Sequence, residues 1–186
     1  MRNSSHGDSG RASSVEDADI LTLCTGSVVF HGSLTLGAES DAPTWFREIF
    51  LPHIAPAFAR GHALALAGTA REVIAIDQAL GASLPAFTGV LASAGRRLLA
   101  AQDPSRGDRV LRRYAAFTQD GTAPGHLPIV FALRAAAFHV PLRQALLAYV
   151  QTEAMAAFGD EHVAWLQEAM IFWTALPPGN VQLHAA

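Results

Sequence analysis

The sequence contains no lysine, and arginine supplies all 13 of its basic residues. The Gly-x-x-x-x-Gly-Lys-Ser/Thr loop that holds nucleotide phosphates in many NTPases is therefore impossible in this chain. The Gly-x-Ser-x-Gly pattern of a hydrolase nucleophile is also missing. These absences exclude two common kinds of catalytic site. If this protein acts together with a nucleotide, a partner protein must bind that nucleotide.

Cysteine is almost as scarce as lysine. Cys24 is the only one, so an intrachain disulfide is impossible and a reducing compartment is expected. The polar N-terminus carries several acidic residues before the first apolar run, which is the wrong charge for a secretory signal. Arg134 and His139 interrupt the apolar run near Leu127 too early for a transmembrane helix. We therefore expect a cytoplasmic protein with no membrane partner.

Charged residues are also few, at 16% of the 186 residues, whereas hydrophobic residues make up 51%. The net charge of −3 argues against a nucleic-acid partner, because proteins that bind nucleic acids carry a basic surface. A chain of this length can bury one sizeable core. Much of its apolar content is alanine, which favours closely packed helices. The composition predicts a globular protein that takes part in an interface.

Apolar residues recur at helical spacing over most of the chain, with few strand signals. We predict an all-α fold, a single-domain helical bundle of about eight helices that spans residues 19–178. Residues 1–18 are predicted to form a mobile polar tail, and residues 179–186 a C-terminal tail. Between residues 20 and 38 the composition fits either a strand or a loop packed on helices.

Several helix boundaries follow from proline, glycine and capping residues. Pro52 interrupts the apolar pattern that includes Trp45, so we expect a helix to end there. Gly81 predicts the end of a later helix, and Ser83 predicts the N-cap of the next one. The pair at positions 103–104, aspartate followed by proline, predicts a further helix start.

The eight histidines are scattered along the chain. They form no His-x-His or His-x-x-x-His pair, whereas a zinc or nickel site needs three or four donors that converge. His162, which follows Asp160 and Glu161, is the best remaining donor candidate. We therefore predict no metal site and no cofactor, with the histidines as core or surface residues.

Arginines cluster on one predicted helix. Arg106, Arg109 and Arg113 recur at three- and four-residue spacing, so they can share one helix face, opposite Val110 and Tyr114. One interpretation is a solvated surface. The other is a docking surface for an acidic partner, to which the forked guanidinium group is well suited. The sequence leaves both interpretations open.

The segment Gly125-His126-Leu127-Pro128 stands before a predicted helix. Glycine permits a tight turn, and proline fixes φ near a helix start, where its missing N–H costs little. His126 would then cap or line the loop. Local geometry alone therefore accounts for this segment without a functional role.

The same segment resembles the Gly-His-x-Pro-Val motif of the urease accessory protein family of the F type. The similarity extends from Ile76 to Phe158 and includes an Ile-Asp-x-x-Leu helix and the arginine-rich helix. The residues from Phe30 to Ser33, Phe-His-Gly-Ser, match the middle of the N-terminal pattern of the family.

The resemblance implies a urease maturation accessory protein rather than an enzyme. Members of that family form cytoplasmic α-helical homodimers, bind a GTPase and a second accessory protein, and help to insert nickel into apo-urease. The small-residue helix from Gly89 to Gly95 would permit the close helix packing that self-association needs. We expect partner-binding residues in three segments: Phe30, Ser33, Arg109, Arg113, Gly125, His126 and Pro128.

A different class of function remains open from the sequence. The chain could be an α-helical ligand-binding domain or enzyme with an apolar pocket around Phe131, Phe138, Tyr149 and Trp165. A small molecule retained on purification would favour that alternative, whereas copurification with a GTPase would favour the accessory protein.

Overall fold

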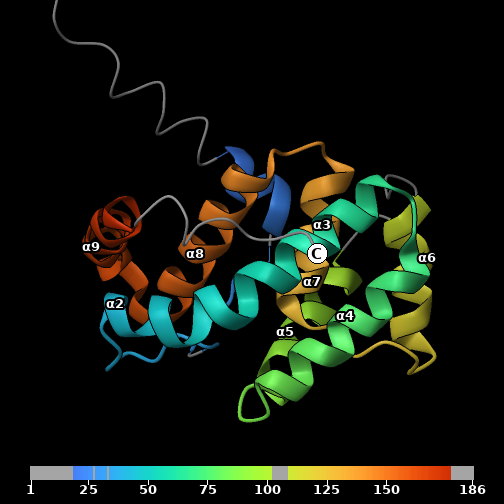
Figure 1. Cartoon of the computed structure of the whole chain (residues 1–186), viewed down its shortest axis with the longest axis horizontal. Helices are drawn as coiled ribbons and strands as arrows, with labels where there is room; N and C mark the ends of the chain where they lie inside the picture. The colour runs from blue at the N-terminus through green and yellow to red at the C-terminus, as the bar shows by residue number, and fades with distance from the viewer. Residues whose placement is uncertain (1–18, 27, 33, 102–108, 177–186) are drawn as a thin grey trace, which may run out of the picture.

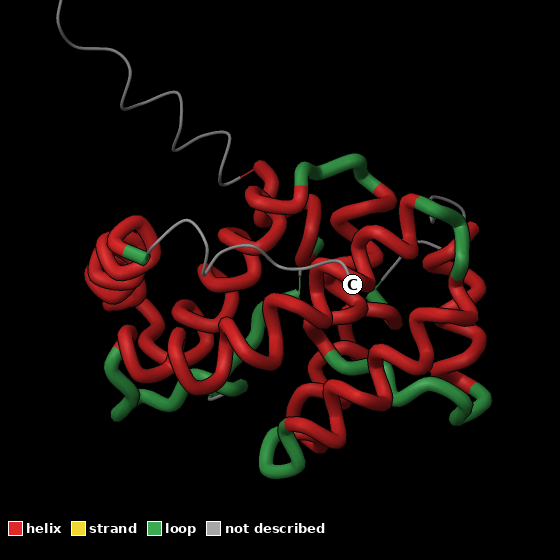
Figure 2. The backbone as a smooth tube through the Cα atoms, in the orientation of Figure 1, coloured by secondary structure: helices red, strands yellow, loops and turns green. Residues whose placement is uncertain are grey.

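A computed structural model describes residues 19–176, except residues 27, 33 and 102–108. Within that part of the chain every regular element is helical (Figure 2), which confirms the predicted all-α class. Among the described residues from 28 to 36 there is no strand, so the loop interpretation is correct there. Residues 20–25 are helical instead, which neither the strand nor the loop interpretation predicted. Both predicted tails and the helix start at 103–104 lie outside the described residues.

The helices follow one another along the chain as Figure 1 shows, and a long loop precedes α2. Residues 19–25 are helical, and the elements after them are α2 (Ala42–Trp45), the π-helix η1 (Phe46–Ile54), α3 (Ala55–Leu66), α4 (Ala70–Ser83), α5 (Thr88–Ala100), α6 (Arg109–Gln119), α7 (Leu127–Ala137), α8 (Leu142–Phe158), the 3-10 turn η2 (Gly159–Glu161) and α9 (His162–Ala175).

Helix α7 is the centre of the bundle. It packs against α3, α5, α6 and α8, and nine of its 11 residues are buried. A helix that is apolar on all sides is stable only when other elements surround it. The Gly-His-Leu-Pro segment leads directly into this helix, so its loop is attached to the most buried element of the fold.

An aromatic cluster joins α2 and η1 to α9. The ring centre of Trp45 on α2 lies 5.7 Å from that of Trp165, and the ring centre of Phe46 on η1 lies 5.4 Å from that of Trp173, both with edge-on geometry. Such contacts add to the stabilisation from burying large apolar surfaces. They hold the C-terminal helix against the start of the bundle.

Three of the predicted helix boundaries are wrong. Pro52 lies inside η1, which continues into α3 without a break. The wider turn of a π-helix accommodates a residue that has no N–H to donate. Helix α4 continues through Gly81 to Ser83, whose hydroxyl donates to the carbonyl of Leu80 at 2.9 Å instead of capping α5. The absence of a side chain at Gly81 leaves room for the ring of His126, because a Cβ at this position would lie 2.6 Å from Cε1 of that ring.

The loop before α2 is attached to α8 through the buried carboxylate of Glu153. Its Oε2 accepts the backbone N–H of Thr35 at 2.9 Å and that of Leu36 at 3.3 Å. Its Oε1 bonds the hydroxyls of Thr35 at 2.8 Å and Tyr149 at 2.6 Å. Burial raises the pKa of Glu153, although the hydrogen bonds from Tyr149 and Thr35 act in the opposite direction.

Helix α5 approaches the start of α7 most closely at Gly95. A Cβ at this position would collide with the carbonyl oxygen of Gly125 and lie 2.8 Å from the backbone nitrogen of Leu127. Gly125 itself has a φ of +77°, which favours glycine. The backbone of α5 therefore lies directly against the loop before α7.

We expect Gly95→Ala to lower the free energy of unfolding by about 2 kcal/mol or more, because the added methyl must displace backbone atoms. Gly89 is the matched control on the same helix, since nothing lies within 4 Å of the position its Cβ would take. Gly89→Ala should stabilise the protein by up to about 1 kcal/mol through helix propensity. Urea denaturation followed by circular dichroism measures both, and equal effects would contradict the close contact.

The raised pKa of Glu153 predicts a pH dependence of stability with a definite sign. A carboxyl whose pKa is higher in the folded state than in the unfolded state contributes stability below the unfolded pKa. That contribution is lost as the pH rises through the folded pKa. Between about pH 4 and pH 8 the free energy of unfolding of the parent should therefore fall relative to that of Glu153→Gln, whose amide side chain does not titrate. Urea denaturation at a series of pH values measures both. Parallel pH profiles would contradict this prediction.

Candidate functional site

The Gly-His-Leu-Pro loop lies against the buried carboxylate of Asp77, which belongs to α4 and has no solvent exposure. Its Oδ2 accepts the backbone N–H of Gly125 at 2.7 Å and the hydroxyl of Tyr114. Its Oδ1 accepts the backbone N–H of His126 at 3.2 Å. One carboxylate therefore joins the loop, α4 and α6.

The imidazole of His126 contacts the same aspartate. Its Nδ1 lies 2.7 Å from Oδ1 of Asp77 and 3.2 Å from the backbone carbonyl oxygen of Asp77. Both oxygens are acceptors, so Nδ1 carries the ring proton, as inferred from this hydrogen-bond network. The other ring nitrogen, Nε2, is buried and has no hydrogen-bond partner among the described residues. An unpaired buried nitrogen is rare enough to need an explanation.

Tyr114 connects this cluster to the arginine-rich helix. Burial, and then the negative charge of Asp77, raises the pKa of Tyr114, so its hydroxyl stays protonated and acts as a donor. Val110 and Leu111 are buried on the same side of α6. The inner face of α6 is thus fixed by apolar packing and by one hydrogen bond to a buried charge.

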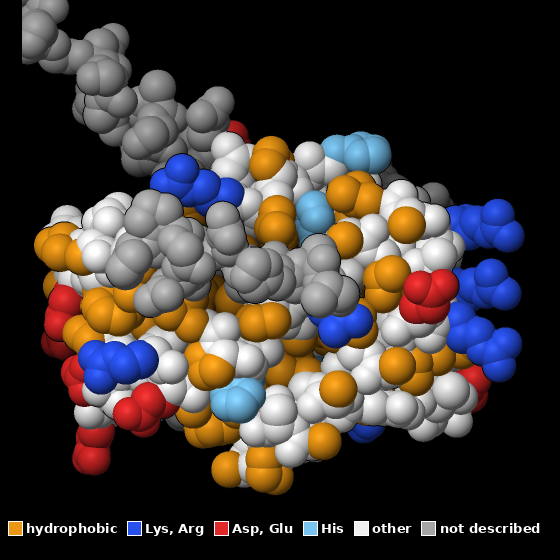
Figure 3. All heavy atoms as spheres, in the orientation of Figure 1, with side chains coloured by type: hydrophobic (Ala, Val, Ile, Leu, Met, Phe, Trp, Pro, Cys, Tyr) orange, Lys and Arg blue, Asp and Glu red, His pale blue; other side chains and the backbone are white. Residues whose placement is uncertain are grey.

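The outer face of α6 carries Arg109, Arg112 and Arg113, all of them exposed. Figure 3 shows basic side chains projecting from the edge of the molecule that α6 occupies in Figure 1. Within the described part of the chain, none of these three arginines forms an ion pair. The role of this face as a docking surface stays a prediction.

The predicted partner-binding residues lie in different environments. Gly125, His126 and Pro128 come together at the start of α7, and all three are buried. Phe30 is also buried, and the guanidinium carbon of Arg97 lies 5.6 Å from its ring centre. Ser33 lies outside the described residues. The buried residues can position a binding surface, whereas the arginines of α6 are the ones that solvent reaches.

Two residues of this cluster, Asp77 and Tyr114, were missed as site residues by the sequence analysis. Their signal was an acidic residue on an apolar helix face, since Asp77 stands between Val73 and Leu80 at helical spacing, and both neighbours are buried. A charge on a buried helix face needs hydrogen-bond donors from elsewhere. Sequence spacing could not identify those donors, because the loop lies 48 residues further along the chain.

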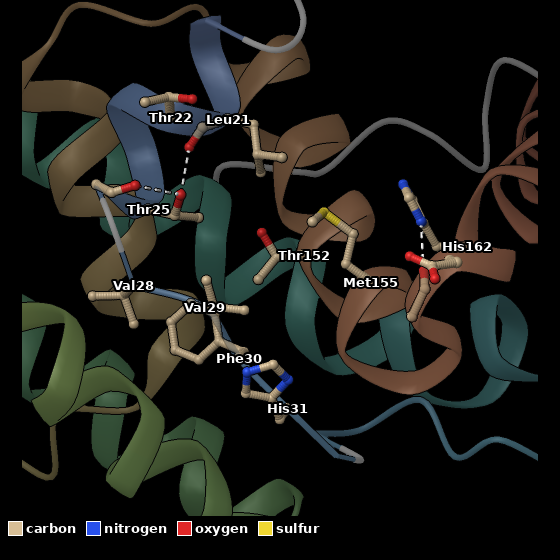
Figure 4. A pocket seen from close by; sticks show the side chains of 13 residues that line it. Leu21, Thr22, Thr25, Val28, Val29, Phe30, His31, Thr152, Met155 and His162 are labelled. Atoms are coloured by element: carbon tan, nitrogen blue, oxygen red, sulfur yellow. Dashed lines mark hydrogen bonds between the residues drawn. The ribbon is translucent and has the colours of Figure 1, made fainter.

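A hollow of about 410 Å³ lies between the N-terminal segment and the end of α8 (Figure 4). Its lining is largely apolar and includes Val29 and Met155. His31 and His162 also line it, and Nδ1 of His162 is bonded to the carbonyl of Gly159 at 2.6 Å. Among the described residues, no three His, Cys, Asp or Glu side chains lie close enough together to hold a metal ion.

The four aromatic residues of the alternative hypothesis do not surround one pocket. Phe131 and Tyr149 are fully buried, with ring centres 5.6 Å apart in the core. Phe138 is 42% exposed and lies beneath the guanidinium of Arg134. Trp165 packs on the aromatic rings near α2. The structure therefore gives the ligand-pocket hypothesis no support at these positions.

The described part of the chain is an all-α protein whose candidate site is a buried carboxylate beneath an arginine-rich face. The UreF family model matches residues 40–158, so the chain belongs to the UreF family of urease accessory proteins. The matched range includes Asp77, Tyr114 and His126, but it begins after Phe30. No curated protein and no solved structure matched the chain. None of the described helices is long and apolar enough to cross a membrane.

The buried cluster predicts strong coupling between its members. We expect Tyr114→Phe to lower the free energy of unfolding by about 1–2 kcal/mol. Asp77→Asn should lower it by about 3 kcal/mol or more, because an amide cannot accept every donor around it. The double variant should lose about 0.5–3 kcal/mol less than the sum of the single losses.

The control for this cycle is Tyr149→Phe, which removes a tyrosine hydroxyl from the other buried carboxylate. Its effect should add to that of Asp77→Asn, because the two sites share no hydrogen-bond partner. Urea denaturation of the single and double variants measures both cycles. If the losses in free energy of unfolding of Asp77→Asn and Tyr114→Phe simply add in the double variant, the two residues do not act as one cluster.

Proposed function

We propose that this protein acts in urease maturation as a scaffold that performs no catalysis of its own. In this proposal it is a cytoplasmic homodimer that binds an accessory GTPase and a second accessory protein. The assembly then inserts nickel into apo-urease. The observation that carries the proposal is the match to the UreF family over residues 40–158.

The arginine-rich face of α6 is the surface we assign to the GTPase. Arg109 and Arg113 are exposed and are free of ion pairs among the described residues. The buried face of the same helix is fixed by the hydrogen bond between Tyr114 and Asp77. Charged groups on a rigid element lose less conformational freedom on binding than groups on a loose one. This arrangement favours recognition of an acidic surface.

The nucleotide belongs to the partner in this scheme. The chain has no lysine with which to build a phosphate-binding loop of the common type. Its contribution would be to orient the GTPase relative to the other components. The buried cluster supports that role, because it keeps the loop before α7 and the arginine helix in one fixed arrangement.

Reversal of the arginine charges tests this assignment. The double variant Arg109→Glu/Arg113→Glu should abolish copurification with the GTPase, because charge reversal at a complementary interface costs about a hundredfold or more in affinity. Its melting temperature should stay close to that of the parent, since exposed charges contribute little to folding. Pull-down of the coexpressed GTPase and thermal denaturation measure the two effects.

The matched control is Arg47→Glu/Arg60→Glu, which makes the same charge change at exposed positions of η1 and α3. This control should retain the GTPase. If the α6 variant also retains it, the arginine face is only a solvated surface. If the parent protein itself retains no GTPase, the scaffold proposal is wrong.

A further inference from the structure

Two hollows lie where the short N-terminal helix, residues 19–25, meets α8. Leu21 of this helix lines the hollow of about 410 Å³, across from Met155 of α8 (Figure 4). Ile20 lines a second hollow of about 170 Å³, together with Gln151 of α8. Closely packed elements leave few spaces of this size between them. The packing of the N-terminal helix on α8 is therefore incomplete.

Arg134 of α7 fastens the C-terminal end of the same helix. Its Nε donates to the carbonyl oxygen of Leu23 at 2.8 Å, and its guanidinium carbon lies 5.4 Å from the ring centre of Phe138. The last carbonyl groups of a helix have no partner within the helix, and they attract a cation. Arg134 has no carboxylate partner among the described residues. Its charge is therefore directed to the end of the N-terminal helix.

The chain turns away from this helix at Gly26, whose φ of +63° favours glycine. A Cβ at this position would lie 3.1 Å from Nη2 of Arg134, so the turn lies directly against the guanidinium. Hinges are a few residues at the ends of elements that absorb a change in φ and ψ. The UreF match begins at residue 40, so the helix and its turn precede the matched range.

One side chain of the N-terminal helix reports on the position of that helix. Cys24 is the only cysteine of the chain, and it is fully buried. Burial raises the pKa of its thiol to about 12, although the positive charge of Arg134 acts in the opposite direction. The thiolate, and not the thiol, attacks a disulfide. Cys24 can therefore react only in molecules in which the helix has moved away from the bundle.

We propose that residues 19–25 form a detachable strap, which Arg134 fastens to the bundle and which turns about Gly26. In the open state the strap leaves its place on α8, while the helices from α2 to α9 stay folded. Opening joins the two hollows into one groove along α8, so the strap controls access to that surface. This device does not depend on the identity of the urease partners.

The rate at which Cys24 of the full-length protein reacts with an aromatic disulfide reagent measures opening of the strap. Arg134→Met keeps the aliphatic part of the side chain and removes the bond to Leu23, so it should raise the rate about tenfold. The matched control Arg143→Met, at an exposed position of α8, should leave the rate within about twofold. Gln151→Leu adds apolar contact at the smaller hollow and should slow the reaction about threefold.

Urea distinguishes opening of the strap from unfolding of the whole bundle. Strap opening exposes little surface, so the reaction rate of the parent should hardly change with urea below the unfolding transition. Gly95→Ala, which is expected to destabilise the bundle, should leave the rate within about twofold. The proposal is overturned if the rate rises with urea as steeply as global unfolding does, or if Cys24 reacts only once the bundle unfolds. Equal rates for Arg134→Met and Arg143→Met would also overturn it.

Discussion

The buried carboxylate of Asp77 is the interaction on which the candidate site depends. In a low-dielectric interior a charge is tolerated only when donors surround it. Here the donors come from three directions: the hydroxyl of Tyr114, two backbone N–H groups at the loop before α7, and the ring of His126. Movement of any one of them would leave a buried charge incompletely paired. The loop and α6 are therefore held in one arrangement.

A second buried carboxyl group, that of Glu153, forms the same pattern of hydrogen bonds elsewhere in the fold. Glu153 accepts a tyrosine hydroxyl and two successive backbone N–H groups of a loop, as Asp77 does. Each carboxylate lies on a helix and fastens a distant loop to it. The alanine-rich helices pack through small side chains, which leave many similar arrangements close in energy. Two buried carboxyl groups, each with several hydrogen bonds, select one of them, because a shifted helix would lose several hydrogen bonds at once.

The docking surface proposed on α6 is attached to this interior. Its arginines lie on the outer face of a helix whose Tyr114 bonds Asp77, and the loop before α7 bonds the same carboxylate. A scaffold must hold its partners in a constant relative orientation, and a buried anchor behind the proposed surface is suited to that task.

Local patterns in the sequence determined the helical class, the arginine spacing on α6 and the small residues of α5, because side-chain periodicity depends only on neighbours along the chain. The family resemblance likewise rested on the Gly-His-Leu-Pro segment. The roles of Gly81 and Asp77 were decided by tertiary structure, since both depend on His126, more than 40 residues away. A glycine that ends a helix and a glycine that admits an imidazole look the same in sequence. Only the packing of α4 against the loop before α7 distinguished them, because it alone brings that ring and its carboxylate together.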